Sequence, residues 1–353
     1  MRQRLPRAEV LCVDLLAFAP GWLRWWYPRL YAFLVGSCPS LWALGYYATD
    51  HPWVFRLCQP ARRCWNALMA RRVMAWARAK QPDVIITTHF FPADVFAAAR
   101  RAGQLACRVI VVITDLFPHR LWLTAGADAI VVGSQETQRL CQRRGIPEGR
   151  LHALGIPIQP ACVSVEDRPR IARRLGLDPL RRTILVASGG MGLGPLHQLV
   201  RRFAARETAH PRQLQLLVVC GENERLRRQL QRFSARSAMP VHVFGFVDTM
   251  HELMAVSDLL ITKAGGMTIM EALAMGLPMI FYGVIPGQER FNAEYVVQRH
   301  AGVMASNAQE VVDVVLRLFE HPQQREAMQA CAASLGRRQA AADIVERLVV
   351  TSS

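Results

Sequence analysis

The chain has 353 residues, of which 52% are hydrophobic and 20% charged, so it is long enough for two globular domains and does not have the composition of a disordered protein. Its net charge is +16, carried almost entirely by arginine, because lysine occurs only at Lys80 and Lys263. The sequence has no zinc-finger spacing, no RNP-like aromatic signature and no long basic heptad helix, which argues against nucleic acid as a partner. We interpret the charge either as compositional bias or as attraction to an anionic membrane surface.

The 9 cysteines include no Cys-x-x-Cys pair, which is typical of a reducing compartment. Residues 1–7 lead directly into a strand-like segment, so we expect no signal peptide. The apolar run at residues 30–47 is interrupted by Gly36, Pro39 and Gly45, whereas a membrane-spanning helix needs about 20 mostly apolar residues. These features predict a protein that lies peripherally on the cytoplasmic side of the cell membrane.

The first predicted elements are a strand at residues 10–13 and, after it, an aromatic segment at residues 21–31. This segment combines three tryptophans with two arginines, namely Trp22, Trp25, Trp26, Arg24 and Arg29. Tryptophan prefers the headgroup level of a bilayer and arginine pairs with lipid phosphate, so we predict that the segment contacts an anionic membrane. The alternative interpretation is an aromatic-rich core helix.

Short β-rich runs then alternate with amphipathic helical runs, a pattern that indicates parallel sheets built from βαβ units. In the first half we expect strands at residues 84–87, 109–113 and 129–132, and helices at residues 93–101 and 135–144. Residues 155–160 contain two prolines and little periodicity, which indicates a linker. In the second half we expect strands at residues 183–187, 214–220, 241–244, 259–262 and 279–282, and a helical tail at residues 332–350.

The alternation predicts an α/β protein with two Rossmann-like domains and with ligands at the carboxyl ends of the strands. We place the domains at residues 1–157 and 158–335. A C-terminal helix at residues 336–353 is expected to pack back on the first domain.

Two glycine-rich segments follow strands of the second half directly. The first runs from Ser188 through five residues to Gly194 and Pro195, and a helix begins after it, so its backbone N–H groups could cradle a phosphate. The second begins Thr262-Lys-Ala-Gly-Gly-Met-Thr and continues to Glu271. Thr268 is a candidate N-cap with Glu271 as its capping-box partner, and the alternative role for Glu271 is to accept the two hydroxyls of a ribose.

A third motif, Pro286-Gly-Gln-Glu-Arg-Phe-Asn292-Ala, follows the last predicted strand. Its neighbouring amide and carboxylate side chains offer donors and acceptors side by side, which suits the vicinal hydroxyls of a sugar. A polar helix start is the structural alternative.

The order and spacing of these motifs resemble the glycosyltransferases that make diacylglycerol glycolipids, namely the family of monogalactosyldiacylglycerol synthase and processive diacylglycerol glucosyltransferase. The muramyl-pathway N-acetylglucosaminyltransferase is a more distant relative. The strongest resemblance lies in Lys263-Ala-Gly-Gly-Met-Thr-Ile-Met-Glu-Ala-Leu-Ala and in the motif at residues 286–293. In the first half, Thr88-His89-Phe90-Phe91-Pro92 and Thr114-Asp115 are also similar to that family.

The resemblance implies a GT-B fold, in which two Rossmann-like domains face each other across a cleft. It also implies an inverting transfer of a hexose from UDP-glucose or UDP-galactose to a lipid, with diacylglycerol as the first expectation. No metal and no cofactor beyond the UDP-sugar would be required, because helix dipoles and backbone N–H groups can stabilise the leaving diphosphate.

The resemblance also implies roles for individual residues. Glu271 would hold the ribose, and the backbone at Phe246 and Val247 would read the uracil. The diphosphate would face a group that comprises Gly190, Met191, Lys263, Gly265, Gly266 and Thr268. Gln288 and Glu289 would hold the donor sugar, with Asn292 supporting their loop. On the acceptor side the resemblance places Asp115, His89, His119 and Trp122, with Asp115 or His89 as the candidate base.

The sequence departs from the family pattern at its start. The family opens with a strand and a Gly-x-Gly-His loop whose histidine is the proposed base, whereas this sequence begins at what resembles the second strand of the family. Without that first strand, the sheet of the N-terminal domain would leave an unpaired edge or a cavity. Three hypotheses therefore stay open: a transferase acting on diacylglycerol, a transferase acting on a polyprenyl-linked wall precursor, and a truncated or inactive membrane-associated nucleotide-sugar binder.

Overall fold

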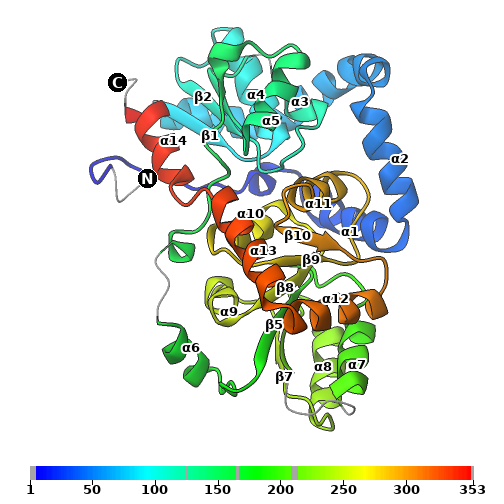
Figure 1. Ribbon diagram of the computed structural model, residues 1–353. Helices are drawn as coiled ribbons and strands as arrows, with labels where there is room; N and C mark the ends of the chain where they lie inside the picture. The colour runs from blue at the N-terminus through cyan, green and yellow to red at the C-terminus, as the bar shows by residue number, and fades with distance from the viewer. Residues whose placement is uncertain (1–4, 125, 164–166, 208–213, 351–353) are drawn as a thin grey trace. The chain divides into compact units, whose positions relative to one another are not determined.

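The computed structural model describes residues 5–124, 126–163, 167–207 and 214–350. The chain forms two compact units (Figure 1). The first unit contains residues 1–157, 286–288 and 339–353, and the second contains residues 158–285 and 289–338. We describe each unit by itself.

The first unit is built on a parallel four-stranded sheet with the order β1-β2-β3-β4. Its strands are β1 (Val84–Thr87), β2 (Arg108–Val112), β3 (Ala129–Val131) and β4 (Leu151–His152). The first three match the predicted strands closely, whereas β4 was not predicted because two residues carry no periodicity. The connecting helices are α4 (Phe90–Arg101) and α5 (Gln135–Arg143).

Alternate residues of β2 pack against different layers, as the two-residue period of a strand requires. Val109 lies in a core cluster with α4, whereas Ile110 and Val112 pack against Ile344 and Leu348 of the helix α14 (Ala340–Leu348). The predicted helical tail is in fact two helices, α13 (Pro322–Leu335) and α14, with residues 336–339 between them. The last helix of the chain therefore closes one face of the first sheet.

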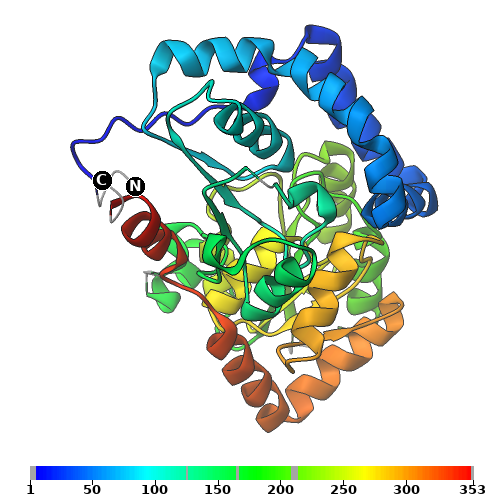
Figure 2. The ribbon, with the colours of Figure 1, turned by 90° about the horizontal axis from the view of Figure 1, so that it is seen from above.

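Three consecutive helices precede this sheet: α1 (Gly21–Ser37), α2 (Pro39–Asp50) and α3 (Pro52–Lys80). In Figure 2 they are the blue to light-blue helices. A proline stands in the first turn of both α2 and α3, where its missing N–H costs nothing. Among the described residues, no helix combines the length and the apolar character needed to cross a membrane.

The strand predicted at residues 10–13 is wrong. Residues 9–14 have no regular secondary structure and lead into the short 3-10 helix η1 (Leu15–Phe18). A cavity of about 1280 Å³ is lined both by this segment and by β1, the edge strand of the described sheet. A strand exists through pairing with a neighbour, so the apolar run at residues 10–13 is not sufficient while the cavity lies along β1.

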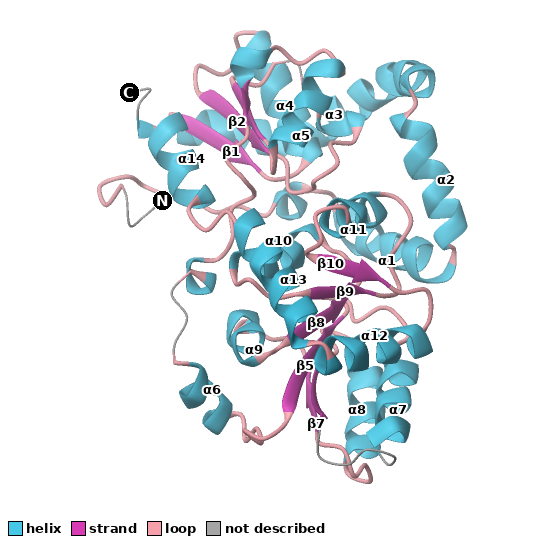
Figure 3. Ribbon diagram, in the orientation of Figure 1, coloured by secondary structure: helices cyan, strands magenta, loops and turns pink. Residues whose placement is uncertain are grey.

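The second unit contains a parallel six-stranded sheet with the order β10-β9-β8-β5-β6-β7 (Figure 3). Its strands are β5 (Arg182–Ala187), β6 (Leu214–Val219), β7 (Val241–Phe244), β8 (Leu259–Thr262), β9 (Met279–Phe281) and β10 (Gly302–Met304). All but β10 were predicted. This is the Rossmann order, in which the chain reverses direction across the sheet between β5 and β8, and ligands bind at the carboxyl ends of the strands at that point.

Helices cover the second sheet. One face forms a continuous core with α7 (Leu196–Glu207), α8 (Glu224–Ser234) and α12 (Ala308–Glu320). Fully buried β-branched and leucine side chains of β5, β6 and β8 fill this core, as is usual for parallel strands buried on both faces. The other helices of this unit are α6 (Arg168–Arg174), α9 (Met250–Val256), α10 (Gly266–Ala274), α11 (Gln288–Val297) and α13.

Gly221 follows β6 at a point where two loops come close together. Its φ is +56°, and an added Cβ would lie 2.1 Å from the carbonyl oxygen of Gly190. That carbonyl accepts the N–H of Glu222 at 2.7 Å, so the loop after β5 and the loop after β6 hold each other in place. Only glycine fits this position.

We expect Gly221→Ala to lower the free energy of unfolding by about 2–4 kcal/mol, because it adds left-handed strain and a backbone clash. The control is Gly149→Ala, whose new Cβ would meet no atom within 4 Å. Chemical denaturation followed by circular dichroism measures both variants, and equal midpoints would contradict the close approach of the two loops.

Candidate functional site

The loop after β5 lies beside the loop after β8 in the second unit. A Cβ added at Gly189, whose φ is +75°, would lie 3.3 Å from Cε of Lys263, so the lysine side chain extends along the glycine-rich loop. At the start of this loop the Ser188 hydroxyl is buried and has no hydrogen-bond partner among the described residues. A cationic side chain and an unsatisfied hydroxyl therefore meet flexible glycine backbone at the switch point of the sheet.

The second glycine-rich segment leads into α10 with its backbone donors uncapped. Gly265 is the N-cap and no side chain caps this helix, so the N–H groups of its first turn face outward at its positive end. The residue just before the cap, Ala264, is fully buried and has a φ of +74°, a strained conformation for a residue with a Cβ. Uncapped donors and stored strain are both frequent at anion-binding loops.

The capping-box interpretation of Thr268 and Glu271 is wrong. The helix begins two residues before Thr268, so neither side chain is placed to cap it. Gly276 follows the end of α10: its φ is +65°, and the N–H groups of Gly276 and Leu277 bond back to the last turn. Glu271 is thus left half-buried without a structural role at the helix start.

Burial raises the pKa of the Glu271 carboxyl above its usual value. The same carboxylate acts with burial to raise the pKa of the Cys162 thiol to about 11, which places Cys162 of the short helix η4 (Pro160–Cys162) near it. A partly desolvated carboxylate without a cationic partner costs stability, and such groups are frequent at binding sites.

A buried ion pair anchors the third motif. Lys263 Nζ lies 3.3 Å from Glu289 Oε1, and each side chain is only 11% exposed. Glu289 also accepts the N–H of Ile285 at 3.1 Å, and the fully buried Asn292 donates its amide to the carbonyl of Ala264 at 3.3 Å. Lys263, Glu289 and Asn292 therefore hold the loops after β8 and β9 together.

The other predicted donor-side residues line loops at the same sheet edge. Phe246 follows β7, and its ring is 62% exposed and passes 3.9 Å from a Cβ added at Gly190. Met191 and Val247 are half-buried in their loops. Gln288 is the first residue of α11 and belongs to the first unit, so its place relative to the donor-side loops stays a prediction.

In the first unit, His89 is the N-cap of α4. Its Nδ1 accepts the N–H of Phe91 at 3.2 Å, which leaves the proton of the neutral ring on Nε2. Desolvation beside the rings of Phe90 and Trp122, at centroid distances of 4.1 and 6.2 Å, lowers the pKa of His89. In this tautomer the outer nitrogen is a donor, so His89 could accept a proton only by giving up the cap.

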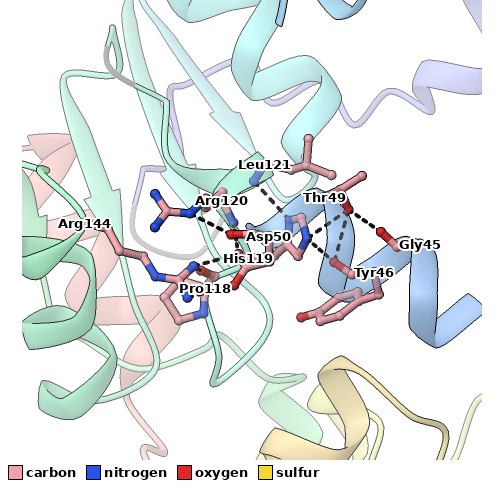
Figure 4. A network of polar contacts seen from close by, with 9 residues as sticks. All are labelled: Gly45, Tyr46, Thr49, Asp50, Pro118, His119, Arg120, Leu121 and Arg144. Atoms are coloured by element: carbon pink, nitrogen blue, oxygen red, sulfur yellow. Dashed lines mark hydrogen bonds and ion pairs between the residues drawn. The ribbon is translucent and has the colours of Figure 1, made fainter. Parts of the chain in front are cut away.

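Both ring nitrogens of His119 form hydrogen bonds within the protein (Figure 4). Its Nδ1 accepts the N–H of Leu121 at 3.1 Å, and its Nε2 donates to the carbonyl of Tyr46 at 3.0 Å. Burial lowers the pKa of His119, although its bond to Tyr46 acts in the opposite direction. The ring is 5% exposed and its hydrogen bonds tie α2 to the segment after β2, so the acceptor-side role of His119 stays a prediction.

The same tie includes a buried ion pair that the sequence did not reveal. Arg144 donates two hydrogen bonds to the carboxylate of Asp50, at 2.8 and 2.9 Å, and the side chains are only 12% and 16% exposed. Asp50 also accepts the N–H of Arg120 at 2.8 Å (Figure 4). Asp50 and Arg144 lie 94 residues apart in the sequence, and no local sequence pattern predicts an ion pair between them.

Asp115 lies half-buried just beyond the carboxyl end of β2, on the segment that this network fixes. Its charge contributes, after burial, to raising the pKa of Tyr46, whose hydroxyl is buried and has no partner among the described residues. Trp122 is 5% exposed and lies in the core with Ile113 and Ile130, and its acceptor-side role stays a prediction. Asp115 is thus the better placed of the two predicted bases.

The predicted membrane segment exposes its aromatic residues. Trp22, Trp25 and Trp26 on α1 are 56%, 52% and 57% exposed, which overturns the core-helix alternative for these three. Arg24 is exposed as well, and the guanidinium of Arg29 stacks 4.1 Å from the Trp25 ring. Further large apolar side chains are exposed in the same part of the chain: Tyr27, Leu30, Phe33, Leu41, Leu44, Tyr47, Trp53, Leu57 and Trp65.

Comparison with known proteins agrees with this architecture. The model of the glycosyltransferase family 28 C-terminal domain matches residues 183–348, and that of monogalactosyldiacylglycerol (MGDG) synthase matches residues 1–158. The probable monogalactosyldiacylglycerol synthase 2 of Oryza sativa subsp. japonica is 32% identical over 346 residues, which cover 96% of this chain and 72% of that protein.

The processive diacylglycerol beta-glucosyltransferase of Bacillus cytotoxicus is 27% identical over 322 residues, which cover 91% of this chain and 79% of that protein. Among solved structures, S. aureus MnaA with UDP is similar with a TM-score of 0.66 and 14% identity, over 82% of each chain. At this identity the likeness concerns the fold.

The two parallel α/β units and the matching family models define a glycosyltransferase with a fold of the GT-B type. Within that class, the identity to the rice relative over nearly the whole chain is decisive. The chain belongs to the monogalactosyldiacylglycerol synthase family.

The raised pKa of Glu271 predicts how stability depends on pH. A carboxyl with a raised folded-state pKa contributes stability below its unfolded pKa and loses that contribution as the pH rises through the folded pKa. We therefore expect Glu271→Gln to raise the free energy of unfolding at neutral pH by about 1 kcal/mol or less, and the gain to vanish in acid.

Denaturation at several pH values measures the effect, with Glu326→Gln on exposed surface as the control. A variant less stable than the parent at neutral pH would mean that Glu271 has a structural partner.

Proposed function

We propose that this protein transfers a hexose from a UDP-sugar to diacylglycerol, with inversion at the anomeric carbon and without a metal ion. The observation that carries the donor half is the convergence, at the β5–β8 switch point, of Lys263, the uncapped start of α10 and the unsatisfied Ser188 hydroxyl. Each of these groups favours a negative charge or can donate a hydrogen bond to one.

On this proposal the diphosphate lies against residues 188–191 and the first turn of α10. Lys263 lies along that loop through its contact at Gly189, and the backbone donors supply the remaining neutralisation. The half-buried Glu271 accepts the ribose hydroxyls, and the exposed ring of Phe246 stands beside the base. The presence of UDP in the complex of the structural relative supports a uridine nucleotide as ligand.

The acceptor half of the proposal rests on the relatives and on the first unit. Both relatives are named for transfer to diacylglycerol, one of galactose and the other of glucose, so both sugars are candidates. The cavity along β1 has many apolar side chains in its walls, with polar and charged side chains among them: Arg7, Glu9, Asp14, Arg62, Asn66, Lys80, Gln81, Asp83, Thr87, Thr88 and His89. Apolar walls with polar groups among them suit the acyl chains and the hydroxyl end of such a lipid.

In the proposed reaction the lipid hydroxyl attacks the anomeric carbon from the face opposite the diphosphate. The bond from that carbon to the diphosphate oxygen breaks as the new glycosidic bond forms, and the hydroxyl proton passes to a base. We assign the base to Asp115, because the cap at His89 leaves its outer nitrogen as a donor.

The decisive test is transfer measured beside donor binding. We expect calorimetry to detect UDP binding, and vesicles with diacylglycerol to accept sugar from UDP-glucose or UDP-galactose in the presence of a chelator. Asp115→Asn should leave the Kd for UDP unchanged and lower the transfer rate by about 10²–10⁴-fold, the usual worth of a general base.

Asp313→Asn, an exposed change on α12, is the control. Binding of UDP without transfer to any acceptor would favour the nucleotide-sugar binder, and transfer only to a polyprenyl-linked sugar would favour the wall-precursor alternative. A folded protein that does not bind UDP would refute the donor assignment.

The exposed tryptophans of α1 lead us to propose peripheral membrane attachment. Replacement of Trp22, Trp25 and Trp26 by serine should reduce recovery with floated vesicles at least about tenfold, because each ring removes a large apolar contact. Leu180→Ser, which also changes an exposed apolar side chain but lies in the second unit, is the control.

Arg24→Gln with Arg29→Gln should reduce recovery on anionic vesicles only. Recovery of the triple tryptophan variant equal to that of the parent protein would exclude this segment as the anchor.

A further inference from the structure

A groove of about 550 Å³ lies on the second unit, between two helices that the donor chemistry does not use. Helix α7 contributes two residues one turn apart, and α8 with the residues after it contributes the opposite wall. The lining residues are His197, Arg201, Arg225, Arg228, Gln229, Arg232, Phe233 and Arg236. Figure 1 shows the two helices side by side at the edge of this unit.

The groove concentrates positive charge that the protein does not neutralise. Within the described part of the chain, Arg201, Arg225, Arg232 and Arg236 have no carboxylate within ion-pair distance. Arg228 lies 3.9 Å from Glu224, but that carboxylate is shared with Arg227 at 2.5 Å, outside the groove. Five guanidinium groups around one hollow repel one another unless an anion enters.

The charges are arranged by helix geometry. Arg225, Arg228 and Arg232 are spaced by three and four residues, so they lie on one face of α8, and Arg201 faces them from α7. The Arg201 guanidinium lies 6.0 Å from the Phe233 ring centroid, and the ring of His197 meets Phe233 edge-on at 6.4 Å. The groove thus offers guanidinium donors together with an aromatic surface.

We propose that this groove binds a phosphate ester. Guanidinium groups match the oxygens of a phosphate in paired hydrogen bonds, and several of them together suit a group that carries more than one negative charge. The hollow is larger than a bare phosphate needs, and Phe233 offers apolar contact to the organic part of the ester. An anionic lipid headgroup and a free phosphate compound share this chemistry.

The site is distinct from the proposed donor site. The donor-side residues of the second unit lie in the loops after its strands and at the start of α10, and none of them lines the groove. The groove can therefore be occupied whether or not UDP binds, and its test does not depend on the proposed function.

His197 supplies a local readout. Burial and then the charge of Arg201 lower its pKa, and a phosphate beside it would raise the pKa again. The side-chain NMR signal of His197, assigned through His197→Gln, follows this pKa while inorganic phosphate is added to the full chain in the presence of UDP.

The groove variant is Arg228→Gln with Arg232→Gln. The matched control, Arg202→Gln with Arg206→Gln, removes the same charge from α7 outside the groove. We expect inorganic phosphate to raise the pKa of His197, and the groove variant to weaken phosphate binding at least about tenfold, because each lost charged hydrogen bond is worth that much. The control variant should bind phosphate like the parent protein.

Flotation with phosphatidylcholine vesicles, with and without phosphatidylglycerol, separates the two sources. A loss of binding to phosphatidylglycerol vesicles in the groove variant alone identifies a lipid headgroup, whereas unchanged flotation with weakened phosphate binding identifies a free phosphate compound. The proposal is refuted if neither phosphate nor the anionic lipid changes the pKa of His197. It is also refuted if both double variants lose binding equally, because charge alone then accounts for the loss.

Discussion

The pairing of β5 with β8 is the constraint on which the donor-side arrangement depends. Ile184 to Ala187 register with Leu259 to Thr262, although about 75 residues separate the two strands along the chain. Because parallel strands end at the same edge, this pairing brings the glycine-rich loop after β5 beside Lys263. The contact at Gly189 follows from that register, whereas the ion pair of Lys263 with Glu289 and the side-chain hydrogen bond of Asn292 follow from the pairing of β8 with β9.

The local sequence pattern was sufficient to predict those strands and loops whose conformation depends on their own residues. The buried strands of the second sheet announce themselves as apolar runs, and glycines after β5 and β8 mark the loops that carry the donor residues. The assignment of Thr268 as the N-cap of α10 was wrong, because Gly265 is the N-cap and caps the helix without a side chain. The spacing of residues in the sequence does not distinguish these two candidates. Residues 10–13 form an apolar run of the length of a strand, yet a strand also needs a neighbour, which the local sequence does not guarantee.

The acceptor-side residues were harder to predict because their roles depend on hydrogen bonds between distant segments. His89 and His119 both begin short helical segments, and in each case a backbone N–H occupies Nδ1 and fixes the tautomer. A histidine used in this way caps a helical segment by accepting a backbone N–H at Nδ1, whatever motif surrounds it. The pair of Asp50 and Arg144 joins α2 to the segment that carries Asp115. Asp115 belongs to a motif that the sequence reveals, but the ion pair that positions it does not.

The position of α14 has a consequence for biosynthesis. Ile344 and Leu348 cover one face of β2, so the first unit receives part of its core from residues that are translated after the second unit. Domains that are contiguous in sequence fold as they leave the ribosome, but this unit keeps an apolar sheet face open until residues 340–348 have been made. The second unit, which needs nothing beyond residue 338, can fold earlier. During synthesis the first unit therefore exposes an apolar sheet face for longer than the second unit does.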